Sequence, residues 1–336
     1  MKQTQSAHRF SLPKWMIGFL VSTQLMGAAL AQSVAPNFPN KPVRIIVPYP
    51  PGGGVDGIAR PLADKLGRAW NQPAVVENRA GAGTILATEL VAKATPDGYT
   101  LLLTSDSTIT SNPFVYAKLT YDAIKDLAPV SLLAVVPQMV VAHPSVAAKT
   151  LKELIALAKS NPAALNYGSY GIGSQPQLVY ESLKVLAGVE FSHVPYKGFA
   201  PAIQAVVAGE VQLTMGSVAL TRGLIAAGKL RPLAIARAER EPTMSDVPTM
   251  KEAGFPTIDP LTWFGLFAPS ATPRAVVMKL NADITAAFSD KEFLDRNIHQ
   301  RGFDSGVGPP EKFAEFIRVD MANKGAMIKN ARIELQ

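Results

Sequence analysis

The fold is decided by residues 41–54, which read Lys-Pro-Val-Arg-Ile-Ile-Val-Pro-Tyr-Pro-Pro-Gly-Gly-Gly. The β-branched run between two prolines predicts a strand over residues 43–47, and a helix is expected over residues 55–70. A strand that enters a helix through a glycine-rich loop is typical of an α/β unit with a mostly parallel sheet.

The same alternation continues along the chain. Strands are predicted at 74–77, 99–104, 129–136, 139–142, 165–167, 191–194, 211–215, 232–235 and 262–268. Helices are predicted at 84–94, 151–160, 177–187, 202–208, 221–227, 273–288, 291–298 and 310–329. This order predicts two α/β halves, each a mostly parallel sheet flanked by helices, with extended crossovers near 136–143 and 260–268.

Two such halves are typical of a two-domain binding protein with its ligand cleft between the domains. We expect a discontinuous domain 1 over residues 37–138 and 264–336, and domain 2 over residues 139–263. A simple division into an N-terminal and a C-terminal half is the alternative.

Composition excludes several classes of protein. With 48% apolar and 18% charged residues, the chain is not a disordered one. The formal charge of +7 is not gathered into a basic block, so we expect no nucleic-acid partner. The absence of cysteine excludes disulfides, thiolate metal sites, cysteine nucleophiles and a lipid-modified N-terminal cysteine.

The N-terminus has the pattern of an export signal. Lys2, Arg9 and Lys14 precede a largely apolar stretch over residues 15–30, which ends in the A-x-A pattern Ala29-Leu30-Ala31. We therefore predict a signal peptide over residues 1–31, cleaved after Ala31. An uncleaved anchor helix is the alternative.

The glycine-rich loop after the first predicted strand is the clearest candidate site. Free N–H groups and the positive end of the helix dipole favour an anion at a helix N-terminus. No Gly-Lys-Ser/Thr follows, so the loop is not a P-loop, and a plain strand-to-helix turn is the alternative. The ligand-binding candidates here are Tyr49, Pro50, Pro51, Gly52, Gly53, Gly54 and Asp56, although Asp56 also has an ion-pair partner four residues on at Arg60.

Two further strand ends carry polar or glycine-rich loops. Because ligands bind outside the carboxyl ends of parallel strands, these loops are expected to line the same cleft. Ser174 is predicted to be a helix N-cap whose hydroxyl bonds the backbone, whereas Ser169 is freer to face a ligand. The candidates are Ser105, Asp106, Ser107, Tyr167, Gly168, Ser169, Gly171, Gly173 and Ser174.

Catalysis has little support in the sequence. Outside the predicted signal the chain keeps only His143, His193 and His299, and none lies in an H-E-x-x-H or G-x-S-x-G context. We therefore expect no enzyme, no metal and no cofactor. Phe264, near the second crossover, either walls the cleft or belongs to the core.

Four stretches together resemble a known family. They are residues 41–48 with 51–53, Val-Glu-Asn-Arg-Ala-Gly-Ala-Gly at 76–83, Pro-Asp-Gly-Tyr-Thr-Leu-Leu at 96–102, and Val-Pro-Tyr-Lys-Gly at 194–198. The chain resembles the tripartite tricarboxylate transporter substrate-binding receptors, the Bug (TctC-like) family of periplasmic proteins.

The resemblance implies a type II-like Venus-flytrap fold and capture of a small organic anion, either a di- or tricarboxylate or an aromatic acid. It implies a monomer in the periplasm that delivers its cargo to the membrane permease subunits of a tripartite transporter. A carboxylate sensor that signals to a membrane kinase is the alternative, and a periplasmic enzyme using Asp56 or Asp106 is a weaker one.

The resemblance also implies a division of roles between the loops. In the family, the loop matching residues 49–54 holds one ligand carboxylate, and the loops matching 168–174 and Tyr196, Lys197 and Gly198 meet the other end. Amino-acid-binding members carry an aspartate where this chain has Gly216 and Ser217, which argues against an α-amino acid as ligand. Many relatives have a histidine where this chain has Gln177.

Overall fold

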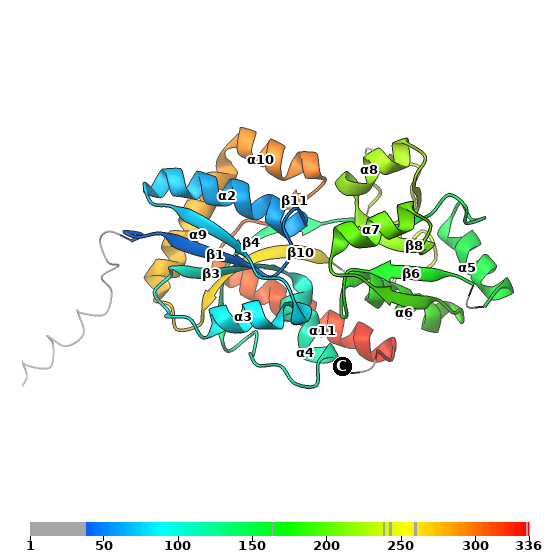
Figure 1. Cartoon of the computed structure of the whole chain (residues 1–336), viewed down its shortest axis with the longest axis horizontal. Coiled ribbons are helices and arrows are strands. Elements are labelled where there is room, and N and C mark those ends of the chain that lie inside the picture. The colour runs from blue at the N-terminus through cyan, green and yellow to red at the C-terminus, as the bar shows by residue number, and fades with distance from the viewer. Residues whose placement is uncertain are drawn as a thin grey trace, which may run out of the picture. The chain divides into compact units, whose positions relative to one another are not determined.

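The computed structural model describes residues 38–162, 164–237, 239–241, 244–258, 261–333 and 335, and the predicted signal peptide lies outside them. The described strands form two sheets (Figure 1). The first has six strands in the order β11 (Asp304–Ser305), β4 (Leu127–Val136), β10 (Thr262–Pro269), β3 (Thr100–Ser105), β1 (Val43–Val47) and β2 (Ala74–Asn78). The second has five, in the order β7 (Ser192–Pro195), β6 (Asn166–Ser169), β8 (Leu213–Ser217), β5 (Gln138–Ala142) and β9 (Arg231–Ala236).

Both sheets are mixed, where the sequence predicted mostly parallel ones. β1 pairs in parallel with β2 and β3, and β6 pairs in parallel with β7 and β8. The strands at the crossovers run the other way: β10 is antiparallel to β3 and β4, and β5 is antiparallel to β8 and β9. The chain changes sheet through these strands, and this connectivity sets their direction.

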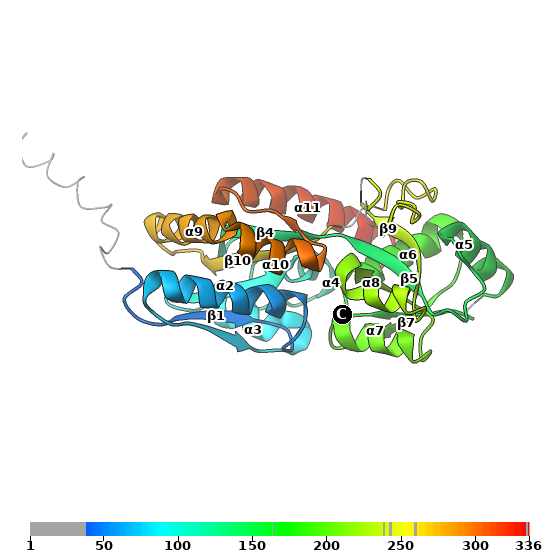
Figure 2. The same ribbon diagram turned by 90° about the horizontal axis from the view of Figure 1, so that it is seen from above.

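Helices cover both faces of each sheet (Figures 1 and 2). The first sheet carries α2 (Gly54–Trp70), α9 (Arg274–Ser289) and α10 (Lys291–Asn297) on one face, and α3 (Ile85–Ala92) and α11 (Pro310–Asn330) on the other. The second carries α7 (Phe199–Val207) and α8 (Val218–Ala226) on one face, and α5 (Leu151–Ser160) and α6 (Gln175–Ala187) on the other. Each sheet with its helices is called a lobe below. No helix of the described residues is long and apolar enough to span a bilayer.

The chain passes between the lobes where the sequence placed its crossovers. β4 ends at Val136 and β5 begins at Gln138, so the change of sheet falls on Pro137 (Figure 2). Proline has no N–H to donate to a ladder, and a strand ends readily beside it. The chain returns to the first sheet with β10.

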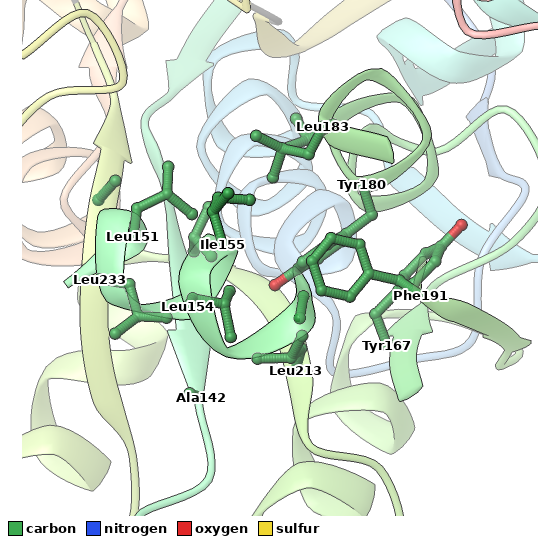
Figure 3. Packing of buried hydrophobic residues seen from close by; sticks show 14 of the residues in the cluster. Ala142, Leu151, Leu154, Ile155, Tyr167, Tyr180, Leu183, Phe191, Leu213 and Leu233 are labelled. Atoms are coloured by element: carbon green, nitrogen blue, oxygen red, sulfur yellow. The ribbon is translucent and has the colours of Figure 1, made fainter. Parts of the chain in front are cut away.

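The second lobe is built around an aromatic core (Figure 3). The ring of Tyr167 stacks on Tyr180 with centroids 4.5 Å apart and on His193 at 4.9 Å. Phe191 meets Tyr180 edge-on at 5.5 Å. Leucines and isoleucines of α5 and α6 close over these rings, so the loops at the ends of β6 and β7 stand on a rigid support.

The sequence analysis did not predict several short elements, among them a π-helical turn η2 (Ser107–Ser111), the helix α4 (Asn112–Val115) and the two-residue strand β11. The segment Ser-Thr-Ile-Thr-Ser has little helix propensity. Its threonine hydroxyls bond inward instead, since Thr108 accepts from Thr104 at 2.7 Å and Thr110 donates to Asp320 at 2.7 Å. Tertiary hydrogen bonds therefore hold a turn that propensity alone does not predict.

A buried charge cluster fixes α11 against the first sheet. Lys324, only 1% exposed, contacts the carboxylate of Asp106 and donates to the Leu261 carbonyl at 2.8 Å. Its ammonium lies 3.8 Å from Asp320, which also accepts from the Trp263 indole at 2.8 Å. One lysine thus serves two buried carboxylates, Asp106 directly after β3 and Asp320 one turn earlier on α11 itself.

Replacing this lysine leaves two buried acids without a cation. We expect Lys324→Met to lower the free energy of unfolding by about 3–5 kcal/mol, the usual cost of removing one partner from a buried ion pair. The matched control is Lys329→Met on an exposed position of the same helix, which should change the stability by less than about 0.5 kcal/mol. Urea titration of both variants measures the difference, and equal stabilities would contradict the structural role of Lys324.

Candidate binding site

A pocket lies between the two lobes. The first lobe and the β4–β5 crossover contribute Tyr49, Pro50, Pro51, Gly53, Gly54, Val55, Ser105, Asp106, Ser107, Val136, Gln138, Thr262, Phe264 and Phe303. The second lobe contributes Tyr170, Gln175, Lys197, Gly198, Phe199, Ala200, Pro201, Ser217 and Leu220. Most of these residues lie at or after the carboxyl ends of β1, β3, β6, β7 and β8, where α/β proteins place their ligands.

Four helices begin at this pocket. Gly53, the N-cap of α2, and Gly198, the N-cap of α7, provide no capping side chain. Ser217 caps α8 by accepting the Leu220 N–H at 3.4 Å, and Gln175 is the first residue of α6. Because the positive ends of these helices converge from both lobes, the pocket favours an anion.

The glycine-rich loop before α2 is held in shape by Asp56. Its carboxylate, almost fully buried, accepts the Gly52 N–H at 2.9 Å, the Asn78 amide at 2.9 Å and the Arg60 guanidinium at 3.0 Å. Gly52 has a φ of +84°, which suits glycine. Asn78 also donates to the Tyr49 carbonyl at 3.0 Å, so Asp56 and Asn78 together fix both ends of the turn.

The pKa of Asp56 reflects this position. Burial acts to raise it, but the hydrogen bonds from Arg60, the Gly52 N–H and Asn78 outweigh burial and lower the pKa below the ordinary value of 3.8. The carboxylate is therefore charged at neutral pH and is fully engaged within the protein. Asp56 does not line the pocket: it organises the loop that does.

Hydroxyl groups lie beside that loop. The Tyr49 hydroxyl is 2.7 Å from the Ser105 hydroxyl and 3.1 Å from that of Thr108. Ser105 and Ser107 are 3.0 Å apart. Each hydroxyl rotates to donate or accept, so this cluster adds adaptable donors next to the start of α2.

A chain of hydrogen bonds at the pocket ties the second lobe to the start of β10 in the first lobe. The Tyr170 hydroxyl donates to the Gln138 side chain at 2.6 Å, and Gln138 donates to Thr262 at 3.1 Å. Thr262 then donates to Gln175 at 2.6 Å. Gln138 and Thr262 begin the two crossover strands β5 and β10, so this chain joins the lobes where the backbone does.

Asp106 is the one anion among the described residues that line the pocket. Burial raises its pKa, the ammonium of Lys324 acts to lower it, and the nearby Asp320 raises it. The contact with Lys324 offsets its charge, so Asp106 does not cancel the field of the helix starts. Lys197, an exposed side chain, is the one cation among the described lining residues.

Twelve predicted site residues line the pocket: Tyr49, Pro50, Pro51, Gly53, Gly54, Ser105, Asp106, Ser107, Lys197, Gly198, Ser217 and Phe264. Phe264 also packs edge-on against Phe303, with centroids 5.8 Å apart. The other predicted residues lie behind or beside the lining: Gly52, Asp56, Tyr167, Gly168, Ser169, Gly171, Gly173, Ser174, Tyr196 and Gly216.

For several of the predicted residues outside the lining, the contacts explain why they do not face the pocket. Ser169 is fully buried and its hydroxyl bonds the His193 ring at 2.6 Å, so it does not face the pocket as the sequence suggested. Tyr167 belongs to the aromatic core and donates to Glu181 at 2.7 Å. Ser174 is the N-cap of α6, and its hydroxyl donates to the Gly171 carbonyl at 2.5 Å. A side chain on Gly216 would come within 2.5 Å of Thr221.

Sequence reasoning missed the residues that wall the pocket in the second lobe. Phe199 and Leu220 both lie in the first turn of a helix that follows a strand, and this position was the available signal. Gln138 lies one residue after Pro137, at a crossover that the sequence did locate. Phe303 precedes a two-residue strand and had no local signal. No cluster of three or more histidine, aspartate or glutamate side chains suited to a metal occurs among the described residues.

Two α/β lobes around an anion-favouring pocket are the architecture of a solute-binding protein. Residues 58–333 match the model of the tripartite tricarboxylate transporter family receptors, TctC, and the chain belongs to that family. As the sequence motifs indicated, the chain is similar to Bug proteins. The solved periplasmic binding protein BugD is 31% identical, with a TM-score of 0.82 over 89% of this chain and 100% of BugD.

Two solved relatives from Rhodopseudomonas palustris carry a bound acid. Rpa4515 with adipate is 32% identical, with a TM-score of 0.84 over 89% of this chain and 100% of its own. MatC with malate is 32% identical, with a TM-score of 0.80 over 87% of this chain and 100% of its own. The family and its solved relatives are solute-binding proteins of the periplasm.

The contacts of Asp56 predict how its loss affects stability. We expect Asp56→Asn to lower the free energy of unfolding by about 1–3 kcal/mol, because a buried charge-assisted network loses its negative charge and one of its two acceptor oxygens. The matched control is Asp64→Asn on the same helix, whose pair with Arg68 at 2.8 Å is exposed and should contribute less than about 1 kcal/mol.

The same variant has a defined pH dependence. A carboxylate whose pKa is lowered by folding stabilises the protein above its unfolded-state pKa of about 3.9, and this contribution is lost as the pH falls through the folded-state value. The stability difference between the wild type and Asp56→Asn should therefore be constant above about pH 5 and shrink below pH 4. Denaturant titrations from pH 7 to pH 3 measure it, and a difference that grows in acid would contradict the assignment.

Proposed function

We propose that this protein is a periplasmic receptor that captures a small organic carboxylate in the pocket between its lobes. The observation that carries the proposal is the convergence of four helix N-termini from both lobes on one pocket, three of them (α2, α6 and α7) without a side-chain cap hydrogen bond. Backbone N–H groups at such ends bind carboxylates through charge-assisted hydrogen bonds. The pocket-lining residues named above are the ligand contacts of this proposal, with the carboxylate at Gly53, Gly54 and Val55.

The proposal includes a division into domains. Residues 37–138 with 264–336 form domain 1, residues 139–263 form domain 2, and they close on the ligand by a hinge at the crossovers. The hydrogen-bond chain from Tyr170 to Gln175 lies beside those crossovers and supports a pivot there. The protein acts as an exported monomer, cleaved after Ala31.

Membership of the receptor family supports delivery of the ligand to the membrane permease subunits of a tripartite tricarboxylate transporter. An enzymatic role would rest on Asp56 or Asp106, and both carboxylates are held by ion-pair partners within the protein. We therefore propose a receptor without catalytic activity.

The ligands of the two solved relatives, adipate and malate, suggest the first acids to test. We expect at least one small carboxylate from a panel of adipate, malate, citrate and benzoate to raise the melting temperature of the protein. A ligand at 1,000 times its Kd adds about 4 kcal/mol to the free energy of unfolding. If no member of the panel at millimolar concentration changes the melting temperature, and mass spectrometry of the denatured protein detects no acid already bound, the proposal is wrong.

Gly53 offers a direct test of the anion loop. Its φ of −76° suits any residue, and a Cβ there would meet only the Pro50 carbonyl oxygen at 3.8 Å. Because Gly53 lines the pocket, we expect Gly53→Val to fold normally and to weaken carboxylate binding at least about 100-fold by filling the carboxylate position.

The matched control for this variant is Gly308→Val. Gly308 lies outside the pocket lining, and a Cβ there would likewise meet only one backbone oxygen, at 4.0 Å. Calorimetric titration should give wild-type affinity for this control. Wild-type affinity in Gly53→Val as well would show that the carboxylate binds elsewhere.

A further inference from the structure

We propose that the ligand is a carboxylate whose body is plain hydrocarbon, with neither hydroxyl nor ammonium substituents. This inference rests on the proposed function, since it names the class of carboxylate that the same pocket takes. It follows from the side chains around the helix starts and from the partners that their polar groups already have.

The wall of the pocket beside the start of α2 is aromatic. The ring of Phe264 lies 3.0 Å from where a Cβ of Gly54 would stand, and Phe303 lies 3.9 Å from the same point. Both rings line the pocket, as do Phe199 and Leu220 from the second lobe. A carboxylate bound at the N–H groups of α2 therefore places its adjoining carbon atoms against apolar surface.

The polar side chains beside the crossovers are already hydrogen-bonded to one another. Tyr170, Gln138 and Thr262 are joined in one chain of hydrogen bonds at 2.6 and 3.1 Å. The chain continues to Gln175 at 2.6 Å. A hydroxyl on the ligand body competes with these bonds and with those among Tyr49, Ser105 and Ser107, and this competition reduces affinity.

A ligand ammonium group would be disfavoured more strongly. Asp106 is the one carboxylate among the described lining residues, and Lys324 already contacts it. The helix starts present positive ends to the pocket, and the exposed Lys197 adds a further positive charge at its lining. An ammonium group would therefore meet an unfavourable field with no free counter-charge.

Three matched pairs of acids test this preference: succinate against malate, glutarate against glutamate, and benzoate against 4-hydroxybenzoate. Each pair differs in one polar substituent. In calorimetric titrations of the mature chain, we expect the unsubstituted acid to bind about 10- to 100-fold more tightly in each pair that binds measurably. Equal or tighter binding of the substituted member would overturn this inference and leave the proposed function intact. If none of the six acids binds at millimolar concentration, adipate and citrate also fail, and the denatured protein releases no bound acid, the proposed function fails together with the inference.

A variant of the pocket wall tests the physical cause. Leu220 lines the pocket and is 43% exposed, so Leu220→Gln adds a polar partner with little risk to folding. We expect it to reduce the succinate-to-malate affinity ratio at least about threefold. Leu186→Gln, on a 55% exposed position of α6 outside the pocket lining, is the control and should leave the ratio unchanged. An unchanged ratio in Leu220→Gln would show that the apolar wall does not select the ligand, and would overturn the inference.

Discussion

Backbone N–H groups at the start of α2 and α7 remain without side-chain caps, and the pocket depends on this feature. A helix normally satisfies its first N–H groups with a serine, threonine, aspartate or asparagine at the N-cap. Here glycine occupies both N-caps, at Gly53 and Gly198. The nearby Asp56 does not act as a substitute cap, because its carboxylate is turned to Gly52, Asn78 and Arg60. The donors are thereby left to the pocket, and the loop that presents them is held rigid from behind.

The lobes are joined by a second arrangement of polar groups. Gln138 and Thr262 begin the two strands that carry the chain between the sheets, and they bond each other as well as Tyr170 and Gln175. All but Tyr170 are nearly fully buried. Covalent connection and hydrogen bonding therefore coincide at one place. The lobes also meet away from the crossovers, for example at the ion pair of Arg237 and Asp304 at 3.1 Å.

Much of this fold is predictable from the sequence, for identifiable reasons. The alternation of strands and helices is encoded in short stretches of sequence. The crossover at Pro137 and the helix start after the Pro-Pro-Gly-Gly loop are encoded in the same way. Strand direction is not encoded in such short stretches, because β5 and β10 run antiparallel where the chain changes sheet. The pairing of Lys324 with Asp106 joins residues 218 positions apart and left no pattern in the sequence. For the same reason, the glycine and serine loop at 168–174 was assigned to the pocket surface, although tertiary packing turns Ser169 toward His193.

The groups that bind the carboxylate belong to the backbone, and this affects how the ligand preference of such a protein can change during evolution. An N–H group is present whatever residue occupies the position, proline excepted, so most substitutions cannot remove it. The wall formed by Phe199, Leu220 and Phe264 has no such protection, since each side chain is exchanged by a single codon change. Proteins built this way can therefore change which acid they bind through a few substitutions in the pocket wall. Their affinity for the carboxylate group is retained, because it depends on the backbone.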